Sequence, residues 1–177
     1  MQRWRVPFGF ACAALFFLLA RPSAVTLITG GIVALLGLAL RGWATGHLRK
    51  NEALAIGGPY AHTRNPLYLG SFLIGLGFTI AAGRWVLVIL FAALFLGIYV
   101  PVIRVESATL DDLFGEDYQR YRGTVPLFLP RLSPYRGQNV EKTRFDGALY
   151  RRYREYRAAA GLVIAWALLA LKAFYLK

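Results

Sequence analysis

The amino-acid sequence predicts an all-α protein, a polytopic transmembrane helical bundle of about five spans in a single domain over residues 1–177. Three observations predict this fold class. Hydrophobic residues make up 57% of the 177 residues and charged residues only 17%, the mean hydropathy is +0.46, and long apolar runs alternate with basic segments. Such runs are typical of membrane-spanning helices. The predicted spans are residues 6–20, 24–40, 66–82, 85–103 and 158–175.

The first two apolar runs are interpreted as a helical hairpin. Residues 6–20 follow a short basic leader. A cleaved signal peptide has the same pattern, so the sequence leaves open whether this span is retained. The second run, residues 24–40, contains three glycines, which allow a neighbouring helix to approach closely. These are Gly30, Gly31 and Gly37.

The third and fourth spans are joined by a tight turn at Gly83, and Pro101 is expected to kink the fourth span near its end. The segment 104–157 then carries most of the charged residues before the last span begins. Its first part has apolar residues on one helical face. We therefore expect an amphipathic helix at the membrane surface that completes a pocket.

The distribution of charge predicts the orientation. With five spans, one side of the membrane would hold only four of the 21 Lys and Arg residues, namely Arg21, Arg84, Lys172 and Lys177. The positive-inside rule then places the N-terminus and the segment 104–157 in the cytoplasm. The compact size favours a bacterial inner membrane.

Composition also indicates which classes of partner the protein binds. A net charge of +12 in so apolar a chain indicates binding to anionic membrane lipids rather than to nucleic acid. A single cysteine, Cys12, excludes a disulfide framework within one chain, and His47 and His62 are too few for a histidine metal cluster. We therefore expect no metal site.

A polar loop, residues 57–68, interrupts the apolar sequence. Its Asn65-Pro66 pair is a helix-start signal, with Asn65 at the N-cap and Pro66 at the first helical position. The helix that starts there points its N-terminal amides, which carry a partial positive charge, at the loop. Arg64 adds a fixed cation, so the loop suits an anionic group. The alternative is a short polar linker without a binding role.

Glu106 is the second candidate, because an acid within about a turn of the hydrocarbon boundary is costly unless it is paired. An ion pair with Arg104 or Arg64 would be a purely structural explanation. If Glu106 instead joins Arg64, the helix N-terminus, Tyr60 and Tyr68, the site complements a ligand with an ammonium, a carboxylate, a flat ring and a soft cation. S-adenosylmethionine has all four features, although these residues would also suit another zwitterion.

Two motifs extend this interpretation. Gly-Pro-Tyr-Ala-His-Thr-Arg-Asn-Pro-Leu-Tyr-Leu-Gly occupies residues 58–70, and Arg-x-Glu-x₇-Phe-Gly-Glu-x-Tyr-x-x-Tyr-x₃-Val-Pro occupies residues 104–126. Together they resemble the isoprenylcysteine carboxyl methyltransferase family and its phospholipid methyltransferase relatives, over residues 30–131. The resemblance implies an all-helical membrane enzyme that uses S-adenosylmethionine, forms S-adenosylhomocysteine and methylates a lipophilic or lipid acceptor.

The resemblance, together with the electrostatic argument for Arg64, predicts the residues that hold the cofactor. They are Glu52, Leu54, Tyr60, Arg64, Asn65, Pro66, Leu67, Tyr68 and Glu106. The sequence departs from the family where the usual histidine is Asn65 and the second acid is Ser107. The arginine that holds the prenylcysteine carboxylate would fall near Val102. Arg104 is its nearest substitute, so Arg104 and Arg64 are the catalytic candidates, while the acceptor and its oxygen, nitrogen or sulfur atom stay open.

Two other classes of function compete with a methyltransferase. A membrane reductase of the sterol-reductase type has a related architecture and would prefer a nicotinamide cofactor. A non-catalytic lipid-binding protein would use the basic-aromatic run at residues 150–157. A carrier or channel is disfavoured, because the centres of the first four spans carry no charge.

Overall fold

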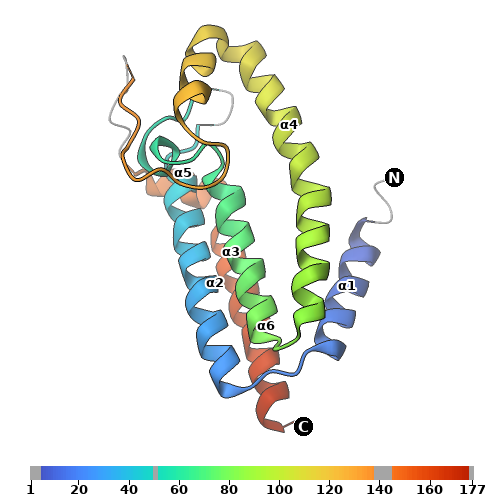
Figure 1. Ribbon diagram of the computed structural model, residues 1–177. Helices are drawn as coiled ribbons and strands as arrows, with labels where there is room; N and C mark the ends of the chain where they lie inside the picture. Colours follow the sequence, from blue (N-terminus) through green and yellow to red (C-terminus); the bar gives the residue numbers. More distant parts are fainter. Residues whose placement is uncertain (1–4, 50–51, 138–144, 176–177) are drawn as a thin grey trace.

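The computed structural model describes residues 5–49, 52–137 and 145–175, and every regular element within them is helical. The long helices form an elongated bundle, and the short helices and loops gather at one end of it (Figure 1). The helices are α1 (Arg5–Leu19), α2 (Ala24–Thr45), the 3₁₀ helix η2 (Gly58–Ala61), α3 (Pro66–Ala81), α4 (Trp85–Thr124), α5 (Gly147–Arg152) and α6 (Tyr156–Tyr175). The predicted all-α class is confirmed.

Three helices, α2, α4 and α6, are long and apolar enough to cross a membrane. The α3 helix is apolar too but has 16 residues, and α1 has 15. A bundle of about five spans therefore stays a prediction for these two helices. Large apolar side chains point outward on the three long helices, among them Ile32, Ile89 and Ile164. Outward apolar side chains suit contact with lipid.

Glycines bring the backbones of α2 and α3 into direct contact at two places. A Cβ atom at Gly30 would lie 2.3 Å from the carbonyl oxygen of Gly77, and one at Gly37 would lie 2.6 Å from that of Gly70. No side chain longer than hydrogen fits at such a distance, so this α2–α3 seam requires glycine on both helices. The prediction that the second span admits a close neighbour is confirmed.

Polar contacts join the helices at the end of the bundle that is far from the loops. The backbone amide of Arg21 donates to the carbonyl of Ala82 at 2.8 Å, which joins the turn before α2 to the end of α3. The Lys172 ammonium of α6 donates to the carbonyls of Phe17 and Leu18 and lies over the Phe17 ring. These contacts anchor α1 and α6 to the α2–α3 pair.

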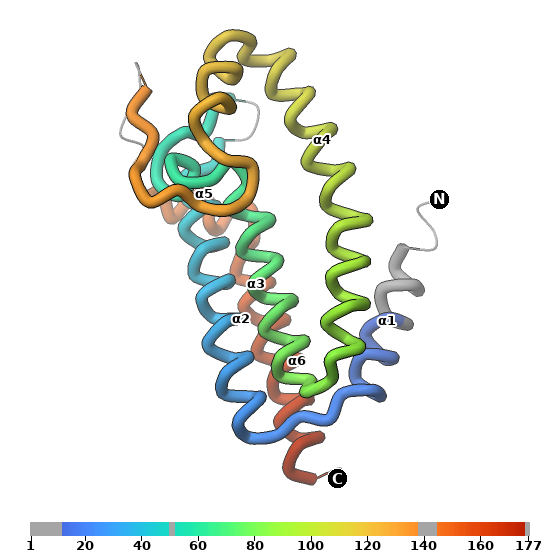
Figure 2. The backbone as a smooth tube through the Cα atoms, viewed as in Figure 1, coloured from blue at the N-terminus to red at the C-terminus, as the bar shows by residue number. Residues whose placement is uncertain are grey.

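The α4 helix continues the predicted fourth span without interruption into the charged segment. Its backbone keeps helical angles at Pro101 and leaves them at Gly115, where φ is 49° and ψ is −122°. The helix therefore breaks at Gly115, since glycine alone adopts this conformation readily. The kink expected at Pro101 stays a prediction. Beyond Gly115 the helix folds back over the loops (Figure 2), and the Arg122 guanidinium lies 3.5 Å from the Asp111 carboxylate. That this segment is an amphipathic helix on the membrane surface stays a prediction.

Candidate active site

The polar loop and the segment after α4 are joined by a set of hydrogen bonds. Three of these link main chain to main chain at 2.9–3.0 Å, from Arg64 to Pro126, from Arg131 to His62 and from Tyr135 to Ala61. The Thr63 hydroxyl adds a bond of 2.9 Å to the carbonyl of Phe128. The two motifs predicted to build one site thus lie against each other, although they are far apart in the sequence.

The α3 helix begins at Pro66, with Asn65 at the N-cap position, as the sequence predicts. The Asn65 side chain does not cap the helix. Its amide instead donates to the carbonyl of Leu127 at 2.9 Å. The first amides of α3 therefore have no side-chain cap and keep their partial positive charge at the loop.

A cavity of about 740 Å³ lies between the first turn of α3, the middle of α4 and the segment around residues 48–55. We refer to it as the central cavity. All but one of the residues predicted to hold a cofactor line it, namely Leu54, Tyr60, Arg64, Asn65, Pro66, Leu67, Tyr68 and Glu106. Ligand sites in proteins commonly have volumes of roughly 300–1,000 Å³.

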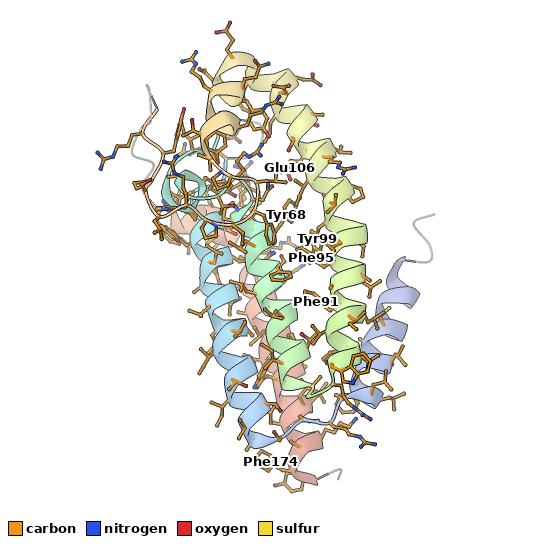
Figure 3. The ribbon with its side chains drawn as sticks, viewed as in Figure 1. Tyr68, Phe91, Phe95, Tyr99, Glu106 and Phe174 are labelled. Carbon is orange, nitrogen blue, oxygen red and sulfur yellow. The ribbon has the colours of Figure 1, made fainter. Side chains whose placement is uncertain are left out.

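Glu106 and Tyr68 face each other from α4 and α3 (Figure 3). The Tyr68 hydroxyl donates to Glu106 Oε2 at 2.8 Å, and the Tyr68 ring packs edge-on against Tyr99 with ring centroids 5.3 Å apart. Within the described part of the chain, Glu106 forms no ion pair with Arg104 or Arg64. The Glu106 carboxylate at the cavity wall is thus held by the Tyr68 hydroxyl and not by a cationic partner among the described residues.

Tyr60 and Arg64 form another part of the wall. The Tyr60 side chain is buried, and its main-chain carbonyl accepts a 2.7 Å hydrogen bond from the Tyr121 hydroxyl. Burial, and then the nearby Glu106 carboxylate, raise the pKa of the Tyr60 phenol far above its ordinary value, so the ring stays neutral. The buried Nε of Arg64 has no hydrogen-bond partner among the described residues. Arg64 also lines the central cavity, and a guanidinium at a cavity wall suits an anionic ligand.

Comparison with known proteins shows the family of this chain. The model of the phospholipid methyltransferase family matches residues 22–117, more than half of the chain. The chain belongs to the phospholipid methyltransferase family. The predicted resemblance is confirmed in this respect.

Three relatives show how far the similarity of this family member extends. It is 34% identical over 144 residues to the cobalt-zinc-cadmium resistance protein CzcN of Cupriavidus metallidurans, covering 77% of this chain and 66% of that one. It is 35% identical over 81 residues to the protein-S-isoprenylcysteine O-methyltransferase of Schizosaccharomyces pombe, covering 46% and 34%. The nickel-cobalt-cadmium resistance protein NccN of Alcaligenes xylosoxydans xylosoxydans is 33% identical over 127 residues, covering 67% and 56%.

The chain therefore spans less than two thirds of the length of each of these relatives. No solved structure matches it. Although two relatives are named for metal resistance, the described residues of this chain contain no group of three or more His, Cys, Asp or Glu side chains that could share a metal ion.

Two predicted residues of this family member lie away from the central cavity. Glu52 is exposed and lies 3.7 Å from the Arg152 guanidinium. Arg104 is also exposed and is not part of the cavity wall. Arg104 and Glu106 are two positions apart on a helix, so their side chains point to different faces. Of the two catalytic candidates, only Arg64 reaches the cavity.

The sequence analysis missed Arg41, which lines the cavity from the end of α2, and Glu155, its ion-pair partner. The signal for Arg41 was its position at the end of an apolar run, the same argument that singled out Glu106. Nothing in the sequence connects Arg41 to Glu155, which lies 114 positions away. Tyr118 and Tyr121 also line the cavity. They were part of the second motif but received no role.

Proposed function

We propose that this protein is an integral membrane methyltransferase that takes its methyl group from S-adenosylmethionine and transfers it to a lipophilic acceptor. The observation that carries the proposal is the central cavity. Its wall combines Arg64 with Glu106, a carboxylate that has no cationic partner among the described residues. Family membership supports a methyltransferase over the other classes of function.

The residues of the cavity fit this cofactor by charge and shape. The guanidinium of Arg64 and the uncapped amides of α3 suit its carboxylate. The Glu106 carboxylate suits its ammonium group or its ribose hydroxyls. The neutral ring of Tyr60 suits the adenine or the sulfonium. Because a guanidinium does not lose its proton in proteins, the role of Arg64 is electrostatic and it is not a general base.

When bound in the central cavity, S-adenosylmethionine would supply a methyl carbon activated by its sulfonium, and the sulfur would be the leaving group. The chain's residues hold the two reactants in line and exclude water, which can account for much of the rate of such a displacement. The described cavity assigns no general base, so the proposal does not choose between oxygen, nitrogen and sulfur as the accepting atom.

A lipophilic acceptor is supported by the side of the cavity formed by α4. Val102 and Val105 both line the cavity, and they are 43% and 69% exposed. The cavity wall thus includes accessible apolar side chains on this side. The isoprenylcysteine methyltransferase among the relatives acts, by its name, on a lipid-modified residue.

The distribution of basic residues supports a location for the protein. Basic residues gather at the end of the bundle that holds the cavity, including the exposed Arg151, Arg154 and Arg157. We propose that this end faces the cytoplasm of a bacterial inner membrane and contacts anionic lipids there.

Calorimetric titration of detergent-purified protein with S-adenosylhomocysteine tests the proposal. Arg64→Ala is expected to weaken binding about tenfold, the equivalent of one charge-assisted hydrogen bond. Arg104→Ala is the matched control and should bind as the wild type does, because Arg104 lies outside the cavity. Absence of binding by folded wild-type protein would contradict the proposal. Binding of a nicotinamide cofactor in its place would indicate a reductase.

A further inference from the structure

A second charged group lies beside the central cavity, outside the two motifs. The Arg41 guanidinium of α2 donates to both carboxylate oxygens of Glu155, from Nε at 2.6 Å and from Nη2 at 3.0 Å. The Glu155 side chain is 7% exposed and that of Arg41 24%. Because this bidentate pair is largely removed from water, its geometry is far more restricted than that of a surface ion pair.

The backbone around Glu155 is shaped to bring its carboxylate to this place. Glu155 lies in the turn between α5 and α6, which packs beside the end of α2 that is close to the loops (Figure 1). The preceding residue, Arg154, has a φ of 55°. This conformation is rare for residues other than glycine and persists only where the surrounding structure enforces it. The Glu155 amide donates to the carbonyl of Tyr150 at 3.2 Å, which fixes the turn.

Arg41 also binds the beginning of α3. Its Nη1 donates to the Ser71 hydroxyl at 2.5 Å and to the Leu67 carbonyl at 3.4 Å. The stem of Arg41 passes over Gly70, where a Cβ atom would lie 2.5 Å from Arg41 Cγ. Arg41 and Leu67 both line the cavity. Tyr68, the next residue along α3, orients Glu106 across the cavity.

We propose that Glu155 is a positioning residue of the active site, which fixes the first turn of α3 through Arg41. The segment α5–α6 would then complete the site from outside residues 22–117, the part matched by the family model. Glu155 acts on the ligand only through Arg41 and α3. This inference rests on the proposed function, because its effect is measured on the binding of the cofactor product.

Orientation explains this pair better than stability does. A buried ion pair can often be replaced by apolar side chains of similar size without loss of stability, because desolvation offsets the attraction. Apolar side chains would not hold the Leu67 carbonyl and the Ser71 hydroxyl in one geometry. The contribution of the pair is therefore the fixed position of α3 at the cavity wall.

The test is calorimetric titration of S-adenosylhomocysteine into detergent-purified Glu155→Gln, with the melting temperature and the folded fraction measured on the same samples. Glu155→Gln keeps the size of the side chain but removes its charge. Its dissociation constant, counted per folded molecule, is expected to rise about tenfold, as commonly follows loss of an orienting partner. Glu116→Gln is the matched control, since that carboxylate is 92% exposed on α4, and its dissociation constant should not change.

Ser71→Ala separates positioning from stability, because it leaves the ion pair intact and removes the hydrogen bond between Arg41 and Ser71, the shorter of the two that Arg41 donates to α3. A raised dissociation constant in Ser71→Ala supports the inference, and Ser71→Ala is the deciding variant if Glu155→Gln does not fold. Wild-type affinity in both variants, with only the melting temperature lowered in Glu155→Gln, would overturn the inference and leave the proposed function intact. Absence of binding by folded wild-type protein would overturn both.

Discussion

Replacing Gly77 with alanine tests the packing that holds α3 in place. A Cβ atom at Gly77 would lie 2.5 Å from the carbonyl oxygen of Gly30 and 2.7 Å from the backbone nitrogen of Ala34. Ordinary contact begins at 3.4 Å, so the new methyl group is about 0.9 Å too close to the first of these atoms. Both atoms belong to the backbone of α2 and cannot rotate away. The helices must therefore move apart.

Two opposing effects decide the size of the change. Alanine is favoured over glycine inside a helix by about 1 kcal/mol. Overpacking of a well-packed interior costs about 1–3 kcal/mol, and the rigid backbone partners at Gly77 place this site toward the upper end. We expect Gly77→Ala to lower the free energy of unfolding by about 1–2 kcal/mol overall.

Gly97→Ala is the matched control, because Gly97 lies within α4 and a Cβ atom there meets nothing within 4 Å. It should be neutral or stabilising by up to about 1 kcal/mol. Thermal unfolding of both variants in the same detergent measures the difference. If Gly77→Ala proves as stable as Gly97→Ala, the close α2–α3 seam is refuted.

Two further perturbations examine the cavity end of the bundle. Gly115→Ala should lower the free energy of unfolding by about 1–3 kcal/mol, because φ is positive at this position and alanine would be strained there. A Cβ atom would meet nothing within 4 Å, so backbone strain alone is tested. Unchanged stability in thermal unfolding would argue against the break at Gly115. Tyr60→Phe should make stability fall less steeply above pH 10 in urea unfolding at a series of pH values. Burial, followed by Glu106, raises the folded-state pKa of this phenol, so only the unfolded state ionises near the ordinary pKa of about 10. Identical slopes in the two proteins would contradict a buried, neutral Tyr60.

The fold was largely predictable, because it depends on local signals. Apolar run length, the Asn65-Pro66 start and the turn at Gly83 all act within a few residues, and α3 begins at Pro66 as predicted. The course of α4 was less predictable. Its backbone breaks at Gly115, and Tyr118 and Tyr121 beyond the break pack against residues far away in the sequence, such as Leu54.

The candidate site was predictable where its residues belong to one motif or to two motifs with a fixed order. Most of the residues predicted to hold the cofactor line the central cavity for this reason. The role of the Asn65 amide was not predictable, because its partner, the Leu127 carbonyl, belongs to a loop that has no regular pattern. The pairing of Arg41 with Glu155 also depends on the packing of α5 and α6 against α2, which the sequence does not encode locally.

Transfer of a labelled methyl group tests the central claim most directly. Membranes that contain the wild-type protein would be incubated with S-adenosylmethionine labelled with tritium in its methyl group, and the radioactivity extracted into organic solvent would be counted. The account predicts label in the organic phase, its suppression by S-adenosylhomocysteine, and its loss in Glu106→Gln. Protein that binds the cofactor yet transfers no label to any extractable molecule would contradict a methyltransferase acting on a lipophilic acceptor.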